Sequence, residues 1–187
     1  MAALTLPRGG TSLIVPRDES CFTRLTVTKG ILRLSASYGA SMEDVTLAFV
    51  GPGQPELVRL DPDRHYVLEA IVNADCELNY DVQAECEQEL IASWLLSFHL
   101  IRHSLGSDQR LNRLLFILAE QFGIVTPVGF RIPFTLPHAR FAELIGSTRS
   151  TVTRQLVILR DQGRLTLSDS GPSMVLRNNP EEPHFWG

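Results

Sequence analysis

The spacing of the apolar residues in this chain changes near residue 84. From Thr11 to about Val82, apolar and polar residues alternate in short extended pieces such as ILRLSASY, and Gly, Pro and Asp clusters separate the pieces. In the segment that begins at Ala84, apolar residues from Ile91 to Leu105 recur three and four positions apart, which is the period of an amphipathic helix. We therefore expect an α+β chain in which a small antiparallel roll or sandwich precedes a helical part.

Charge is distributed unevenly between the two halves of the chain. Residues 1–100 contain 7 basic and 14 acidic residues, whereas residues 101–187 contain 10 basic and 7 acidic residues, in a chain of net charge −4. Of the 17 basic residues only Lys29 is a lysine, and the planar guanidinium of arginine suits phosphates and guanine edges. The C-terminal half is therefore the candidate for contact with nucleic acid.

The sequence contains no constellation that suggests catalysis or a metal centre. Cys21, Cys76 and Cys86 lie far apart without a CxxC pair, so we expect reduced thiols rather than a zinc site or an iron–sulfur cluster. No apolar stretch approaches the roughly 18 residues of a membrane span, and the N-terminus lacks the layout of a signal peptide. We expect a cytoplasmic protein that is not an enzyme and uses no cofactor.

The segment 84–106 is predicted to be one long helix with a heptad seam. Its a and d positions predict a dimerisation helix, and burial of the same residues against the chain's own roll is the alternative. His99 and His103 fall at outward-facing positions of this register, so we expect no metal there. The seam consists of Ile91, Trp94, Phe98, Ile101 and Leu105.

The C-terminal segment contains the elements of a winged helix-turn-helix in order. A helix begins at GSD, with Ser107 or Asp108 as its N-cap, and ends at Gly123. The loop GIVTPVG leads to a strand, FRIPF, and two amphipathic helices follow, HARFAELI and STVTRQLVILRDQ, joined by a turn containing Gly146. Two strands around a Ser/Asp/Gly/Pro turn complete the wing. The predicted domains are a β-roll at 1–83, a dimerisation helix at 84–106 and a winged helix-turn-helix at 107–187.

The second helix of this pair combines an apolar face with an unusual polar one. Val152 and Leu156 are expected to anchor this helix in the core, and Leu144 and Ile145 to anchor the preceding helix. Ala142 of the preceding helix is small enough to let the two helices cross closely. Arginine pairs bidentately with guanine O6 and N7, and short hydroxyls let a helix approach the groove and the phosphates. This pattern predicts a DNA-recognition helix. The polar face presents Thr148, Arg149, Ser150, Thr151, Thr153 and Arg154.

The segment LPHARFAELIGSTRSTVTRQLVILRDQGRLTL resembles the DNA-binding region of the Crp/Fnr family of bacterial transcription regulators, and most closely its cyanobacterial nitrogen-control branch. The resemblance is strong over 108–177 and includes RLNRLLFILAEQFG. It is weaker over 7–83, where PRGGTSLIVP and KGILRLSASYGASMEDVTLAFV are similar to the effector-domain roll. It implies a cupin-like roll of the cyclic-nucleotide-binding type, a homodimer and an inverted-repeat DNA site.

The resemblance also implies roles for residues of the C-terminal module. Arg149 and Arg154 match the guanine-contacting positions of the family's recognition helix, and Ser150 matches the position that varies with half-site preference. Pro137 departs from the Ser or Thr that usually caps the first helix of the pair, so we expect Thr135 to supply the cap. The other expected contacts, to phosphates or the groove, are Ser147, Thr148, Thr151 and His138.

The effector half departs from the family pattern. Members that bind cyclic nucleotide hold its phosphate with a Gly-Glu-Leu stretch and an Arg-Ser or Arg-Thr pair, where this chain has PELVRLDPDRHY. Pro55 takes the place of the glycine, and His65 that of the hydroxyl residue after Arg64. The nitrogen-control branch reaches 2-oxoglutarate with Arg and Glu on its dimer helix, where this chain has Ile91 and Leu96.

These departures predict a regulator that binds DNA without cyclic nucleotide. Glu56 and Arg64 are candidates for a degenerate effector site, with a solvated surface pair as the alternative. The expected partners are double-stranded DNA, a second copy of the chain, and RNA polymerase or a regulatory protein, with no membrane. The rival function is a small-molecule sensor or protein-interaction module in which DNA affinity is residual.

Overall fold

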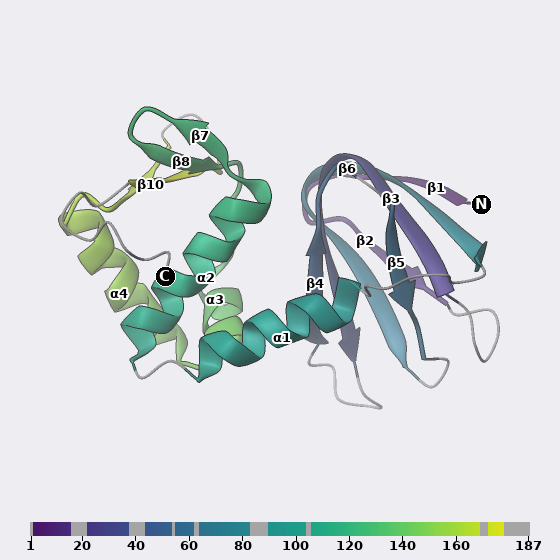
Figure 1. Ribbon diagram of the computed structural model, residues 1–187, viewed down its shortest axis with the longest axis horizontal. Coiled ribbons are helices and arrows are strands. Elements are labelled where there is room, and N and C mark those ends of the chain that lie inside the picture. The colour runs from purple at the N-terminus through teal and green to yellow at the C-terminus, as the bar shows by residue number, and fades with distance from the viewer. Residues whose placement is uncertain are drawn as a thin grey trace. The chain divides into compact units, whose positions relative to one another are not determined.

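The computed structural model describes residues 2–15, 22–37, 44–53, 55–61, 64–82, 90–103, 106–168 and 172–177. The chain forms two compact units, Met1–His99 and Leu100–Gly187. Helix α1 (Leu90–Arg102) contains the boundary between them (Figure 1). Within the described ranges, no helix is long and apolar enough to cross a membrane.

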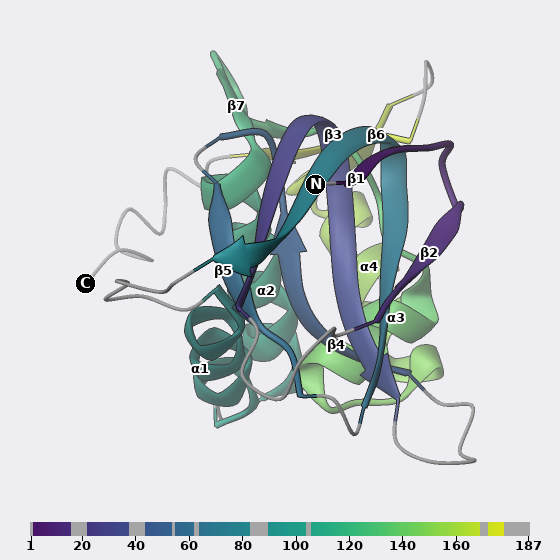
Figure 2. The same cartoon turned by 90° about the vertical axis from the view of Figure 1, so that its right-hand side faces the viewer.

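An antiparallel sheet makes up most of the first unit. Its strand order is β1-β6-β3-β4, with β2 paired to β6 and β5 paired to β3, which confirms the predicted roll. Strand β1 precedes the first predicted strand, and β3 and β6 run side by side along one curved path (Figure 2). The strands are β1 (Ala2–Leu6), β2 (Thr11–Ile14), β3 (Phe22–Ser37), β4 (Asp44–Val50), β5 (Glu56–Arg59) and β6 (His65–Val82).

The 16-residue β3 and the 18-residue β6 stay paired through their bend because their register shifts there. The shifts lie between Val27 and Lys29, and again on either side of Ile31. Gly30 lies at this point with φ of 80°, and a Cβ on it would overlap the carbonyl oxygen of Asn73. Only glycine allows both this backbone conformation and this close approach. Segments that the sequence predicts as several short strands therefore form two long strands, β3 and β6, which bend at bulges.

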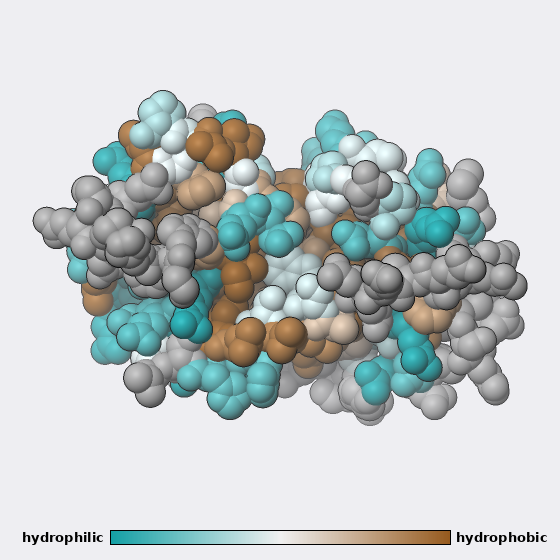
Figure 3. All heavy atoms as spheres, in the orientation of Figure 1, coloured by the Kyte–Doolittle hydropathy of each residue, from teal (hydrophilic) through white to brown (hydrophobic). Residues whose placement is uncertain are grey.

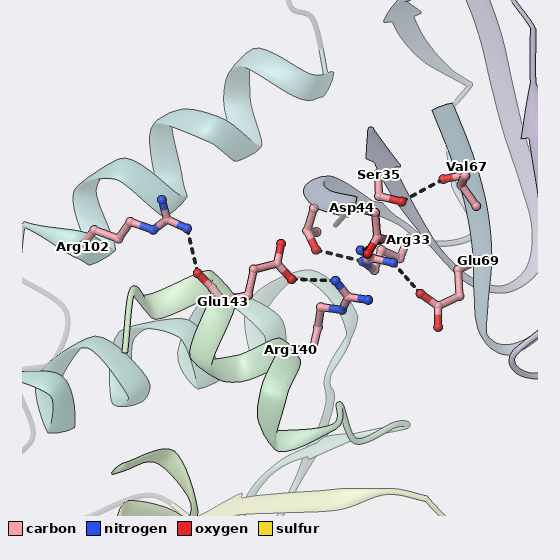
Figure 4. A network of polar contacts seen from close by, with 9 residues as sticks. Arg33, Ser35, Asp44, Val67, Glu69, Arg102, Arg140 and Glu143 are labelled. Carbon is pink, nitrogen blue, oxygen red and sulfur yellow. Dashed lines mark hydrogen bonds and ion pairs between the residues drawn. The ribbon is translucent and has the colours of Figure 1, made fainter. Parts of the chain in front are cut away.

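A buried arginine clamps three strands of the roll. Arg33 of β3 is 1% exposed and lies between Leu32 and Leu34 in sequence. Its guanidinium forms ion pairs with Asp44 of β4 and Glu69 of β6 (Figure 4). Burial of this charge is tolerated because both carboxylates accept its hydrogen bonds. Alternation of apolar and polar residues does not predict such a cluster, since its members are distant in sequence.

Helix α1 carries most of the predicted dimer seam. Trp94, Phe98 and Ile101 are buried within the chain itself. The ring of Trp94 packs edge-on against Phe49 of β4, with the ring centroids 5.5 Å apart. The ring of Phe98, later in α1, has its centroid 5.4 Å from that of Trp94. The alternative interpretation, burial against the chain's own roll, is therefore supported for Trp94, because its partner Phe49 belongs to strand β4 of the roll. Ile91 is half-buried, and Leu105 lies outside the described residues.

The second unit contains three helices and a four-stranded sheet of order β7-β8-β10-β9. The predicted order of helix, strand, helix, turn, helix and wing is confirmed (Figure 1). Strand β7 is an addition, because the sequence GIVTPVG has the composition of a loop. The elements are α2 (Ser107–Phe122), β7 (Ile124–Thr126), β8 (Gly129–Ile132), α3 (His138–Ile145), α4 (Arg149–Asp161), β9 (Leu165–Leu167) and β10 (Met174–Arg177).

Candidate nucleic-acid interface

Helices α3 and α4 are joined by a turn whose geometry depends on glycine. Gly146 has φ of 61° and ends α3 in the left-handed conformation. The N–H of Gly146 donates to the Glu143 carbonyl at 3.3 Å, and that of Ser147 to the Ala142 carbonyl at 2.9 Å. These two bonds form a Schellman motif, which requires a residue that tolerates positive φ. The predicted tight turn at Gly146 is confirmed.

Helix α4 begins at a side-chain N-cap, Thr148, which directly follows the turn. Thr148 has extended backbone angles, and its Oγ1 accepts a hydrogen bond from the Thr151 N–H at 3.2 Å. The same hydroxyl lies 2.9 Å from the hydroxyls of Ser150 and Thr151. The N-cap satisfies a backbone donor that the helix leaves unpaired. Thr148 was predicted as a DNA contact, and its bonds in the structure are those of a helix cap.

The exposed face of α4 carries both arginines of the predicted polar face, Arg149 and Arg154. Val152 and Leu156 are buried on the opposite side, so the helix orientation follows from its apolar positions. Thr151 and Ser147 are half-buried beside this face. The positions i, i+1, i+4 and i+5 of one helix form a single surface. This surface is a shallow, open depression lined by Thr148, Arg149, Ser150, Thr153 and Arg154.

His138 is linked to α4 through a hydroxyl. Its Nδ1 lies 2.8 Å from Thr153 Oγ1, and the Thr153 hydroxyl donates to the Arg149 carbonyl at 2.9 Å. Because that hydroxyl has a single proton, His138 Nδ1 is the donor in the first bond. The histidine predicted to contact a phosphate is therefore also a bridge between the start of α3 and the first turn of α4. Sequence spacing does not indicate this bond, since 15 residues separate the two side chains.

Two predicted helix caps are wrong. The N-cap position of α3 is Pro137, and no side chain caps that end, so the expected role of Thr135 is not fulfilled. The N-cap position of α2 is Gly106, which has extended backbone angles, rather than Ser107 or Asp108. At α3, the Pro137 carbonyl accepts from the N–H groups of the first turn, and proline has no donor of its own to satisfy.

The candidate effector residues lie in the first unit. Arg64 forms an ion pair with Asp61 at 3.3 Å, and both side chains are well exposed. Glu56 begins β5, opposite Leu25 of β3, and burial raises the pKa of its carboxyl above the ordinary value. Within the described residues, no group of three or more His, Cys, Asp and Glu side chains is placed to hold a metal ion. In the described residues, the ion pair of Arg64 is thus formed with Asp61, which lies three positions before it in the sequence, rather than with Glu56.

A β-roll followed by a winged helix-turn-helix with an arginine-bearing second helix defines a DNA-binding transcription regulator. A family profile described as a Crp-like helix-turn-helix domain matches residues 109–180. The regulatory protein CysR of Synechococcus elongatus is 32% identical over 156 residues, which cover 76% of this chain and 71% of CysR. The chain belongs to the Crp/Fnr family of transcription regulators.

Further relatives match the chain over different lengths. The global nitrogen regulator of a Synechocystis species is 44% identical over 69 residues, which cover 37% of this chain and only 30% of that protein. A Crp-family transcriptional regulator from Thermus thermophilus has the same fold, with a TM-score of 0.66 at 17% identity, over 95% of this chain and 92% of that one. The chain thus spans less than a third of the nitrogen regulator that it resembles.

Proposed function

We propose that the protein binds an inverted-repeat DNA site as a homodimer, reads each half-site with α4, and does so without cyclic nucleotide. The observation that carries this proposal is the shared exposed surface of Arg149, Ser150, Thr153 and Arg154 on α4. Guanidinium and hydroxyl groups on one helix face are what the major groove accommodates. The DNA-bound protein then regulates transcription through RNA polymerase or a regulatory protein.

The two arginines supply base specificity in this proposal. A bidentate pair between arginine and guanine discriminates against other bases by about 1–3 kcal/mol. Arg149 stands at the first position of α4 and Arg154 one and a half turns later, so they address different base pairs. Ser147, Ser150 and Thr151 provide short groove and phosphate contacts, and His138 a phosphate contact at the start of α3.

The dimer forms, in this proposal, through the outward face of α1. Trp94 and Phe98 are buried within their own chain and leave little surface for a partner. Three leucines remain exposed on the same helix, with Leu96 at 59%, Leu100 at 54% and Leu95 at 42%. Figure 3 shows apolar surface over this helix. In a two-fold dimer that binds an inverted repeat, the two recognition helices face successive major grooves about 34 Å apart.

We propose DNA binding without cyclic nucleotide because the sequence of the roll lacks hydrogen-bond donors that the phosphate of this effector would need. A buried phosphate needs backbone N–H groups, an arginine and a hydroxyl that converge on it. Pro55 has no N–H to donate, and Arg64 is already paired with Asp61. Ile91 and Leu96 of α1 have no charge to offer 2-oxoglutarate. The rival function, a sensor with residual DNA affinity, predicts instead that a metabolite binds the roll while promoter binding stays weak.

A binding panel tests the proposal. Arg149→Ala and Arg154→Ala should each weaken binding to the selected site by about 1–3 kcal/mol and relax base preference at one position per half-site. His138→Ala should weaken all sequences about equally, because a phosphate contact carries no sequence information. Arg113→Ala, which removes the same charge from an exposed position of α2, is the matched control. Unchanged base preference in both arginine variants would overturn the assignment of α4 as the reading helix.

A further inference from the structure

The carbonyl groups at the end of α3 receive hydrogen bonds from outside the helix-turn-helix. The Schellman motif uses the carbonyls of Ala142 and Glu143. Nε of Arg102 donates to the Leu144 carbonyl at 3.2 Å. Its Nη2 donates to the Glu143 carbonyl at 2.7 Å (Figure 4). The last carbonyls of a helix have no partner within the helix, and its C-terminus attracts cations. Arg102 therefore completes the cap of α3.

A second arginine contributes to the same cap from the next helix. Nη1 of Arg110, in the first turn of α2, lies 3.5 Å from the Ile145 carbonyl and 3.4 Å from that of Gly146. Arg102 is the last residue of α1, so the two arginines flank the junction between α1 and α2. Each carbonyl from Glu143 to Gly146 thus accepts a guanidinium N–H. Arg102 donates to the first two carbonyls and Arg110 to the last two.

The recognition helix contacts the same junction directly. Gln155 of α4 is 8% exposed, and its side-chain amide lies 2.6 Å from Ser107 Oγ. With the amide oxygen facing α2, that oxygen accepts from the Ser107 hydroxyl and from the Asp108 N–H at 2.8 Å, and the amide nitrogen donates to the Ser107 carbonyl. Gln155 then caps the N-terminus of α2, which its own N-cap residue Gly106 leaves without a side-chain bond.

We propose that Arg102, Arg110 and Gln155 are positioning residues for DNA recognition. They fix the turn at Gly146 and the body of α4 to the junction between α1 and α2. Gln155 is buried on the side of α4 opposite the reading face, and the two arginines bond to backbone carbonyls of α3 and its turn. Disorder or rotation of the last turn of α1 withdraws Arg102 from α3 and loosens the turn that presents Arg149. This inference rests on α4 being the reading helix.

The salt dependence of DNA binding separates positioning from contact. Arg102→Gln should weaken specific binding about tenfold, as coupled residues outside a binding site do. The slope of log K against log salt concentration should not change, because no phosphate contact is removed. Loss of a phosphate contact would instead reduce that slope by about one. A wild-type affinity or a reduced slope in Arg102→Gln overturns the proposal.

Amide hydrogen exchange gives a readout that does not involve DNA. In Arg102→Gln, the N–H groups of Ser147 and Thr151 should exchange faster, while global unfolding in urea changes little. Arg102→Lys keeps a donor at this position and should restore part of the affinity and of the protection. If Arg102→Gln does not fold, Arg110→Gln and Gln155→Leu make the same test from the other helices. Unchanged exchange in all folded variants overturns the proposal, whatever the result for Arg149→Ala.

Discussion

The indole of Trp94 lies edge-on to the phenyl ring of Phe49, with centroids 5.5 Å apart and planes inclined at 67°. This geometry is favourable for aromatic pairs, which attract edge to face. It attaches the first half of α1 to strand β4 of the same unit. The opposite side of the helix carries the exposed leucines Leu95, Leu96 and Leu100.

Trp94→Ala should lower the free energy of unfolding by about 3–5 kcal/mol, because it removes a buried aromatic side chain and leaves a cavity beside Phe49. Urea denaturation followed by circular dichroism measures this change. Ser93→Ala, at the neighbouring exposed position, is the control and should stay within about 0.5 kcal/mol of wild type. A small effect of Trp94→Ala would mean that the ring is not part of the core.

Leu96→Glu should dissociate the homodimer while leaving each chain folded. A carboxylate at the centre of an apolar interface is buried without a partner, so dimer affinity should fall by about 100-fold. Light scattering measures the mass, and specific DNA affinity should fall with it. Leu13→Glu, a change at another exposed leucine on β2, is the matched control and should remain dimeric. A dimeric Leu96→Glu protein would place the interface elsewhere.

Thr148→Ala should destabilise the recognition helix by about 1 kcal/mol, because the Thr151 N–H loses its acceptor. Thr148→Ser keeps the hydroxyl and should retain most of this stability. Chemical denaturation measures the loss, and DNA binding should weaken at all sequences. If alanine and serine behave alike in both measurements, the cap contributes nothing and Thr148 acts in another way.

Glu56→Gln should change how stability depends on pH. Burial raises the pKa of the Glu56 carboxyl in the folded chain, so the folded state binds this proton more tightly than the unfolded state. That contribution is present below the ordinary glutamate pKa and is lost as pH rises through the folded-state pKa. At neutral pH the variant should therefore melt at a higher temperature than wild type, and the gap should close in acid. A constant gap across the pH range would contradict this assignment.

Cys76 should be inert in the native protein. The thiol is 2% exposed, and burial, assisted by the charge of Asp75, raises its pKa. Because the thiolate is the reactive form, alkylation by iodoacetamide at neutral pH should label the Cys76 peptide only after denaturation. Peptide mapping by mass spectrometry reports this site separately from the other two cysteines. Rapid labelling of the folded chain would show that β6 opens locally.

Much of the fold was predictable because its signals are local. Alternation of apolar residues predicted the roll, and the helical period around Val152 and Leu156 predicted which face of α4 is buried. The long bent strands were not predictable in full, because the register shift at Gly30 depends on the approach of Asn73 from another strand. Strand β7 was missed because its partner β8, rather than its own composition, holds it extended.

The sequence by itself determined the order of the elements, the tight turn at Gly146 and the polar face of α4, since each of these follows from spacing along a few turns of chain. Only the tertiary structure decided which face of α1 is buried, because both of its apolar faces satisfy a helical period and the choice depends on Phe49 of a distant strand. The same holds for the cap of α3. Its donors come from residues about 40 positions away, and no local pattern marks an arginine whose partner is a backbone carbonyl.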